Sequence, residues 1–130
     1  MNAHPRPVLD ADNAPFWLGC REGRLTLQRC GACGTWRFPP RPRCAACASD
    51  DVSLERASGR GEIASYTICH PPVLPAYADR VPYNVIVVRL EEGPHLVSNL
   101  LDAEPFVGMG VVVEFVDVDD ELTLPQFRPA

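Results

Sequence analysis

The sequence contains no lysine, and all 12 of its basic residues are arginines. It also lacks any apolar run near the roughly 20 residues that span a bilayer, and no hydrophobic signal region follows its N-terminus. Hydrophobic residues make up 46% of the chain and charged residues 22%, the balance of an ordinary globular protein. These absences predict a cytoplasmic protein that neither enters nor crosses a membrane.

Charge is distributed unevenly along the chain. Residues 1–60 hold nine arginines and six acidic residues, a net charge of +3, whereas residues 61–130 hold three arginines and eleven acidic residues, a net charge of −8. Arginine is favoured where planar phosphate or carboxylate groups are bound. A bias in genomic composition explains the missing lysine equally well.

Four of the six cysteines form two Cys-x-x-Cys pairs, Cys30 with Cys33 and Cys44 with Cys47, with ten residues between the pairs. This spacing predicts four thiolates around one tetrahedral ion. Two disulfides or free core thiols are the alternative. A redox Cys-x-x-Cys motif is disfavoured because no strand-helix-strand pattern surrounds the pairs. Cysteines in metal spacing favour a reducing compartment.

Four protein thiolates fill a tetrahedron, so this ion is predicted to be structural and not catalytic. It would hold together a segment too short to bury a core of its own. Zinc is the expected metal. Iron in a rubredoxin-like site, and with it an electron carrier, stays open because the same sulfurs bind both metals.

Residues 1–28 are predicted to form an extended arm and a short helix. Asp12 or Asn13 is expected to cap the helix, Pro15 to lie in its first turn and Gly23 to end it. Such a short helix cannot bury its two aromatic side chains by itself. They are expected to pack either on the rest of the chain or on a partner protein.

A zinc ribbon is expected over residues 29–57, after a strand over residues 24–29. Three prolines between the cysteine pairs forbid a helix there. Two aromatic residues in this connection are expected to cover the metal, and three arginines to project outward as a basic patch: Trp36 and Phe38, and Arg37, Arg41 and Arg43.

Residues 58–130 are predicted to form five strands, over residues 61–70, 83–90, 95–100, 111–118 and 122–127. Five strands in about 70 residues fit a small OB-fold barrel, with a small sandwich as the alternative. Pro125 predicts that the last strand lies at an edge. No internal repeat is apparent, and the expected fold class is mainly β.

Several motifs together resemble the family called domain of unknown function 35, over about residues 12–130. They are Pro15-Phe16-Trp17, the run from Leu27 to Gly34, Pro39-Pro40, Ser58-Gly59-Arg60-Gly61, Pro82-Tyr83, Leu90-Glu91-Glu92-Gly93, Gly108-Met109 and Leu124-Pro125-Gln126-Phe127. The resemblance implies a helical segment, a rubredoxin-like zinc ribbon and an OB-fold. It also implies that the metal ligands are Cys30, Cys33, Cys44 and Cys47, and it implies no catalytic residue.

Members of that family are typically small partners of thiolase-fold enzymes, such as thiolases, hydroxymethylglutaryl-CoA-forming systems, steroid side-chain aldolases and acyltransferases. The resemblance therefore implies an accessory subunit of a hetero-oligomer in lipid metabolism that helps to bind acyl-CoA esters and is not an enzyme by itself. Candidate contacts to the CoA phosphates are Arg37, Arg41, Arg43 and Arg60. Candidate partner contacts are Phe16, Trp17, Tyr77 and Tyr83.

Single-stranded nucleic-acid binding is the alternative function, because zinc ribbons and OB-folds both occur in such proteins. The net charge of −8 on the barrel half disfavours it, since such sites need a basic groove. Cys69 and His70 form a poor nucleophile-base pair, because neighbours on a strand point to opposite faces. The sequence therefore predicts no catalytic site and no nucleic-acid partner.

Overall fold

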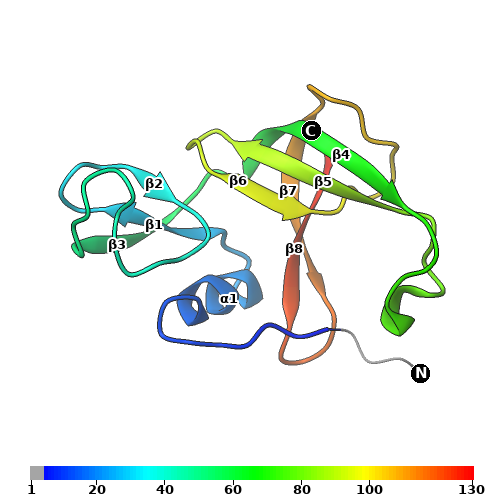
Figure 1. The fold of residues 1–130 in the computed structure, drawn as a ribbon, viewed down its shortest axis with the longest axis horizontal. Coiled ribbons are helices and arrows are strands. Elements are labelled where there is room, and N and C mark those ends of the chain that lie inside the picture. The colour runs from blue at the N-terminus through cyan, green and yellow to red at the C-terminus, as the bar shows by residue number, and fades with distance from the viewer. Residues whose placement is uncertain (1–4) are drawn as a thin grey trace.

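The computed structural model describes residues 5–130, in which one helix and a small sheet adjoin a larger curled sheet (Figure 1). The helix is α1 (Ala14–Arg21). The small sheet contains β1 (Thr26–Cys30), β2 (Trp36–Arg37) and β3 (Val52–Arg56). The large sheet contains β4 (Arg60–Cys69), β5 (Tyr83–Leu90), β6 (His95–Ser98), β7 (Gly110–Asp117) and β8 (Thr123–Pro129), and a 3-10 turn, η1 (Pro75–Tyr77), lies between β4 and β5. Within residues 5–130, no helix has the length and apolarity that a membrane crossing requires.

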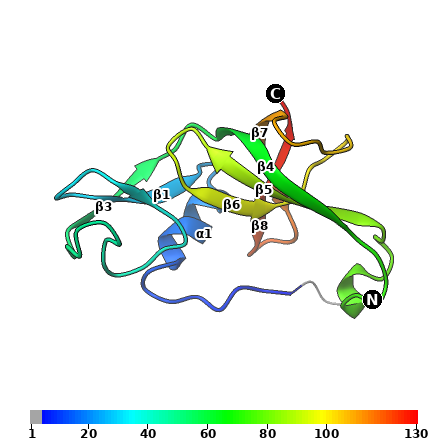
Figure 2. The ribbon, with the colours of Figure 1, turned by 45° about the horizontal axis from the view of Figure 1, so that its top comes forward.

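The large sheet curls into a half-barrel. Its antiparallel strands follow the order β6-β5-β4-β7-β8, and β7 and β8 cross behind the other three strands (Figures 1 and 2). A parallel bridge between Leu100 and Phe127 joins the two edges at one point. The Phe127 N–H donates to the Asn99 carbonyl at 3.0 Å beside this bridge. A partly open, five-stranded barrel of this kind is an OB-fold, so the predicted fold class is confirmed.

The predicted barrel strands are all present, with ends that differ by a few residues. β5 covers residues 83–90 as predicted, whereas β8 continues to Pro129, beyond the predicted end at residue 127. β8 is the last strand in the order of the sheet, and Pro125 pairs there with Phe115 of β7. The edge position inferred from Pro125 is therefore confirmed, since proline has no N–H to donate to a further strand.

The helix ends as the sequence predicts. Gly23 has a φ of +77°, the left-handed conformation that glycine adopts without steric cost. The Arg24 N–H donates to the Gly19 carbonyl at 2.8 Å, and the Gly23 N–H donates to the Cys20 carbonyl at 3.1 Å. This pair of bonds is the Schellman motif, which satisfies carbonyls that the end of a helix leaves without partners.

The start of the helix differs from the prediction. Asn13 occupies the N-cap position, but its side chain makes no capping hydrogen bond. The Asp10 carboxylate instead accepts hydrogen bonds from the amides of Asp12, at 2.9 Å, and Asn13, at 2.8 Å. A side-chain cap by Asp12 or Asn13 is therefore wrong, because the carboxylate that orders this turn lies earlier in the chain.

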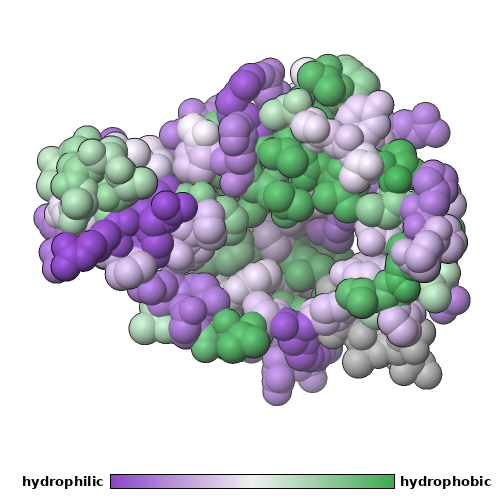
Figure 3. All heavy atoms as spheres, viewed as in Figure 1, coloured by the Kyte–Doolittle hydropathy of each residue, from purple (hydrophilic) through white to green (hydrophobic). Residues whose placement is uncertain are grey.

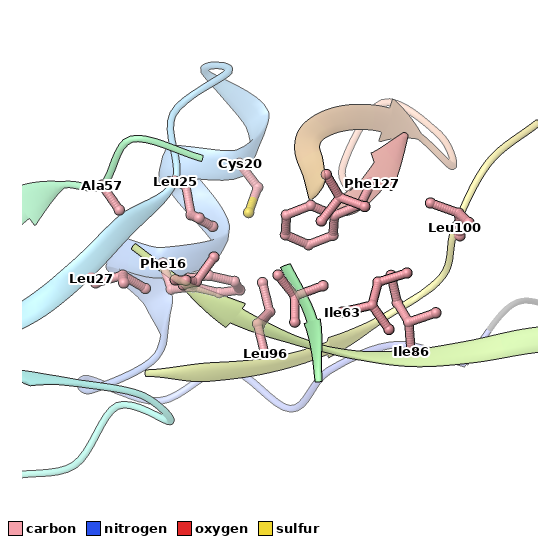
Figure 4. Close-up of a cluster of buried hydrophobic side chains, with 13 residues drawn as sticks. Phe16, Cys20, Leu25, Leu27, Ala57, Ile63, Ile86, Leu96, Leu100 and Phe127 are labelled. Atoms are coloured by element: carbon pink, nitrogen blue, oxygen red, sulfur yellow. The ribbon is translucent and has the colours of Figure 1, made fainter. Parts of the chain in front are cut away.

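One hydrophobic core joins the helix, the start of the small sheet and the barrel. Figure 4 shows side chains from these three parts pointing toward one another. Ile86 and Phe127 are completely buried, and Phe16 is 5% exposed. The core also contains Cys20, Leu25, Leu27, Ala57, Ile63, Val88, Leu90, Leu96, Leu100 and Val111. The helix therefore packs against β1 of the small sheet and against β7 and β8 of the large sheet.

The small sheet has the order β2-β1-β3, with β1 in its centre. The strand predicted over residues 24–29 is β1, which begins two residues later. Neither β2 nor β3 was predicted from the sequence. β3 was detectable, because residues 52–55 alternate apolar and polar side chains. β2 has two residues, too few for such a pattern.

Candidate metal centre

The first cysteine pair lies in a tight turn that we call the first knuckle, residues 30–35. The Gly34 N–H donates to the Cys30 carbonyl at 2.9 Å, and the Cys30 N–H donates to the Thr35 carbonyl at 2.9 Å. Gly34 has a φ of +78°, which turns the chain back toward its start. Both ends of the knuckle are therefore joined by backbone hydrogen bonds.

The second knuckle, residues 44–49, repeats this backbone pattern. The Ala48 N–H donates to the Cys44 carbonyl at 2.8 Å, and the Cys44 N–H donates to the Ser49 carbonyl at 2.9 Å. Ala48 has a φ of +63° at the position that corresponds to Gly34. The chain thus contains a short structural repeat that the sequence analysis missed.

The two knuckles bring together all four cysteines that the sequence analysis identifies as ligands. Their sulfurs lie within 4.8 Å of one another. The Sγ atoms of Cys30 and Cys47 are 3.5 Å apart, and those of Cys33 and Cys44 are 3.7 Å apart. Metal–sulfur bonds of about 2.3 Å in a tetrahedron separate the sulfurs by about 3.8 Å. The cluster therefore fits one four-coordinate ion.

Neighbouring groups shift the pKa values of these thiols in opposite directions. The hydroxyl and amide of Thr35 lower the pKa of Cys33 to about 6, and the Cys33 backbone lowers the pKa of Cys30. The Ser49 backbone also lowers the pKa of Cys47, but the sulfurs of Cys30 and Cys33 oppose it and raise that pKa to about 12. Four adjacent sulfurs therefore resist complete ionisation by themselves. A divalent cation removes this repulsion, so its binding releases protons.

Arg37 is buried, so the expectation that it projects outward is wrong. It is 6% exposed, and its Nε donates to the Gln28 Oε1 atom at 2.7 Å. Another guanidinium nitrogen donates to the Arg41 carbonyl at 2.9 Å, while the Arg41 N–H donates to Gln28 Oε1 at 2.9 Å. Arg37 and Gln28 are paired across β2 and β1, which places their side chains together. This pair binds the backbone of the loop that leads to the second knuckle.

The other three candidate contacts to CoA phosphates are exposed. A guanidinium nitrogen of Arg43 donates to the Ala48 carbonyl at 3.2 Å. Arg60 donates twice to the Glu91 carboxylate, at 3.0 and 3.2 Å. The Arg41 side chain makes no hydrogen bond or ion pair with residues 5–130. The structure therefore gives the four predicted arginines different surroundings.

Among the predicted partner contacts, Phe16 lies in the core and offers little surface to a partner. Of the two expected arrangements, packing on the chain or on a partner protein, the structure shows packing on the chain for Phe16. Trp17 is half-buried, with its ring 5.1 Å from that of Phe16. The rings of Tyr77 and Tyr83 are stacked with centroids 5.2 Å apart.

Trp17 and Tyr77 line the same hollow, of about 390 Å³, between the helix and the barrel. Its other walls come from β6, β8 and the connection between the knuckles. Figure 3 shows that this face of the molecule is hollowed at its centre. A second hollow, of about 670 Å³, shares Tyr77 with the first and extends over the barrel past Tyr66 and Tyr83. All four predicted partner contacts thus line these two hollows, although Phe16 is 5% exposed and adds little surface.

The two remaining cysteines lie apart from the metal ligands. Cys20 is completely buried in the core, and burial raises the pKa of its thiol to about 12. Such a thiol is protonated at neutral pH and is not a nucleophile. Cys69 is half-buried beside Tyr83, and their hydrogen bond raises the pKa of Tyr83.

Two family profiles match the chain in sequence. Residues 17–53 match "ChsH2, rubredoxin-like zinc ribbon domain", and residues 54–116 match "ChsH2, C-terminal OB-fold domain". A "DUF35 domain-containing scaffold protein" of Methanothermobacter thermautotrophicus is 36% identical over 94 residues, which cover 71% of this chain and 70% of the relative. The chain belongs to the DUF35 family. The predicted family, OB-fold and zinc ribbon are thereby confirmed.

Two further relatives relate this DUF35 chain to larger assemblies. A chain of the solved structure described as "Ltp2-ChsH2(DUF35) aldolase" matches with a TM-score of 0.87 and 43% identity, over 95% of this chain and 98% of that one. A "Probable enoyl-CoA hydratase alpha subunit" of Thermomonospora curvata is 44% identical over 129 residues. The match covers 97% of this chain but 40% of the hydratase subunit, so the DUF35 chain spans about two fifths of that relative.

Proposed function

We propose that this DUF35 chain is a non-catalytic accessory subunit of a complex that acts on acyl-CoA esters. We further propose that its partner is a thiolase-fold enzyme, such as an aldolase, a thiolase or an acyltransferase. The observation that carries the proposal is the match to 98% of a chain in the Ltp2-ChsH2(DUF35) aldolase, at 43% identity. In this role the chain helps to assemble the complex and to bind the CoA ester.

The relatives support an accessory role because they are named for different reactions. One is described as an aldolase and the other as an enoyl-CoA hydratase subunit. Cleaving a carbon–carbon bond and adding water need different catalytic groups, so a module shared by both is expected to supply neither set. The metal site agrees with this expectation, since four thiolates leave no position for a substrate on a tetrahedral ion.

A hydratase subunit is the second candidate, and a specific observation favours it. The Thermomonospora curvata relative matches 97% of this chain. In that case the hydration chemistry lies in a part of the complex that the match does not include, because the match covers 40% of the relative. The accessory role of the DUF35 chain is the same under both candidates.

We propose zinc as the metal, since structural sites with four thiolates usually carry it. We also propose a reducing cytoplasm, because free thiols persist in that compartment. The test is metal analysis together with an absorption spectrum of the purified protein. One equivalent of zinc in a colourless sample is the expected result. A coloured sample with one equivalent of iron would instead support the electron carrier.

The connected hollows carry the proposed contact with the partner enzyme. Aromatic residues are enriched at protein interfaces, and Trp17, Tyr77 and Tyr83 lie around these hollows. Arg41 and Arg60 keep the proposed contact with CoA phosphates, because charge-assisted hydrogen bonds favour guanidinium there. Arg37 keeps it only if the Gln28 contact is broken, since its guanidinium is buried.

Nucleic-acid binding gains no support from the barrel surface. Arg80 is the one basic residue among those that line the larger hollow, which also contains Glu104. Single-stranded nucleic acids require a basic groove that follows the phosphates. Titration with labelled oligonucleotides at two salt concentrations tests this alternative, and we expect no salt-dependent binding.

The main test asks whether a neighbouring reading frame encodes a thiolase-like enzyme, and then co-expresses and purifies the two proteins for an acyl-CoA assay. We expect a complex of fixed stoichiometry, turnover that requires the enzyme, and no turnover by the DUF35 chain alone. Trp17→Ala and Tyr77→Ala should weaken the complex, whereas Val107→Ala, at an exposed site outside the hollows, should not. Turnover of an acyl thioester by the isolated chain would contradict the accessory role.

A further inference from the structure

An arginine stands immediately before each cysteine pair, and both arginines make the same kind of contact. Arg29 Nε donates to the Gly34 carbonyl at 2.9 Å in the first knuckle. A terminal nitrogen of Arg43 donates to the Ala48 carbonyl at 3.2 Å in the second. The repeat that relates the two knuckles therefore includes a side chain as well as the backbone.

In each of these hydrogen bonds, the acceptor is the carbonyl oxygen of the residue in the knuckle that has a positive φ, Gly34 or Ala48. That residue turns the chain back toward the start of its knuckle. The guanidinium reaches this carbonyl from the residue that precedes the first cysteine of the pair. The arginine thus connects the two ends of the knuckle from outside the backbone turn.

The charge of the arginines also suits a metal centre. A divalent ion with four thiolates has a net charge of −2, and the guanidinium groups of Arg29 and Arg43 each bind the backbone of a knuckle that carries two of these thiolates. Residues 1–60 carry a net charge of +3, so positive charge prevails in the half of the chain that contains the ligands. Groups just outside the ligands of a metal ion orient those ligands and affect metal affinity.

We propose that Arg29 and Arg43 are positioning residues of the metal centre, one for each knuckle. Each holds the carbonyl of the left-handed residue and thereby keeps its two thiolates in place for the ion. This inference goes beyond the accessory role and does not depend on it, because it concerns metal retention by this chain alone. It also gives Arg43 a function other than contact with CoA phosphates.

The two arginines are not equally constrained. Arg29 also lies over the Trp36 ring at 5.1 Å and forms an ion pair with Glu55 at 3.7 Å. For Arg43, the bond to the Ala48 carbonyl is the one side-chain hydrogen bond within residues 5–130, and no ion pair or ring contact accompanies it there. Arg43 is therefore the better residue to change, since its substitution removes the knuckle contact and disturbs little else.

The experiment measures how fast the metal-loaded, full-length protein releases zinc to excess colorimetric chelator. We expect Arg43→Met to release the ion about tenfold faster than the wild type, the scale on which such outer groups act. Arg43→Lys should fall between them, because lysine keeps the charge but lacks the planar fork. Arg41→Met is the matched control, since Arg41 lies in the same loop, is exposed and makes no side-chain bond.

Equal release rates for Arg43→Met and the wild type would overturn the proposal. Equal acceleration by Arg41→Met and Arg43→Met would also overturn it, because charge alone would then explain the effect. A second measurement is hydrogen exchange of the Ala48 amide in the metal-loaded state. That amide donates to the Cys44 carbonyl, and it should exchange faster in Arg43→Met but not in Arg41→Met.

Discussion

Residues 29–56 and the barrel are stabilised in different ways. All of residues 29–56 are described, and the buried ones are Cys30, Arg37 and Cys44: two proposed metal ligands and a hydrogen-bonded arginine. The barrel instead buries aliphatic and aromatic side chains, of which Ile86, Val88 and Phe127 have no exposed surface. Each such side chain contributes about 1.5–3 kcal/mol on burial, whereas the knuckles have only the ion and their hydrogen bonds.

The border between these two modes of stabilisation lies within β1. Leu27 belongs to the shared core, while Cys30, at the end of the same strand, lies in the cluster of four cysteines. The helix belongs with the barrel, because Phe16 and Cys20 pack in its core. Sequence distance from the barrel therefore does not decide which part needs the metal. What decides it is whether a segment places apolar side chains in the core.

The largest effect is expected from loss of a buried ligand. Cys44→Ser should remove most of the binding energy of a structural zinc ion, which is about 10–16 kcal/mol in small zinc domains. The knuckles should then unfold while the barrel keeps its structure. Metal analysis and circular dichroism of the purified variant measure both results. Cys69→Ser, which changes a cysteine outside the cluster, should keep one equivalent of metal.

The reverse experiment weakens the barrel and leaves the metal in place. Phe127→Ala empties a completely buried site, so it should lower the free energy of unfolding by about 3–5 kcal/mol. Denaturant titration measures this loss. Val97→Ala, at a side chain that is 65% exposed, should change it by less than about 0.5 kcal/mol. Faster zinc release from native Phe127→Ala would contradict the separation of the two parts.

The buried Cys20 thiol predicts that the free energy of unfolding depends on pH through the core. Burial raises its pKa from 9.0 to about 12, so above pH 9 the unfolded chain loses this proton before the folded chain does. The stabilisation is therefore complete below pH 9 and is lost as the pH rises toward 12. Cys20→Ala should reduce the fall in unfolding free energy over this range, whereas Val97→Ala, at an exposed side chain that carries no titratable group, should not. Denaturant midpoints between pH 8 and 11 provide the measurement.

A smaller effect is expected at the left-handed residue of the second knuckle. Ala48 has a φ of +63°, where its Cβ is strained and glycine is not. Ala48→Gly should therefore stabilise the metal-loaded protein by about 0.5–1 kcal/mol, after the entropy that glycine adds to the unfolded chain. Thermal unfolding checks this gain. Ala45→Gly in the same knuckle, where φ is not positive, should give no stabilisation.

The sequence predicted the parts of this molecule that depend on regular spacing. The cluster of four cysteines followed from two Cys-x-x-Cys pairs, the barrel strands from alternating residues, and the end of the helix from Gly23. The polar contacts within the ribbon were not predictable in this way. The burial of Arg37 depends on a partner nine residues earlier, Gln28, and on a two-residue strand that shows no periodicity.

One signal in the sequence was available and was not used. The runs Arg29 to Thr35 and Arg43 to Ser49 share the order arginine, cysteine, two small residues, cysteine, small residue and hydroxyl residue. Compared side by side, they predict two equivalent knuckles. The sequence does not predict that Ala48 adopts a positive φ where the first knuckle has a glycine, because alanine rarely adopts that conformation.

We propose that the ion stabilises the knuckles and that packing stabilises the helix and barrel. Hydrogen exchange, followed by residue in metal-loaded and chelator-treated protein, tests it most directly. We predict that amides of residues 30–35 and 44–49 lose protection without metal, while those of β4, β5 and β7 keep it. Equal loss of protection in the barrel strands, or unchanged protection in both knuckles, would contradict the account.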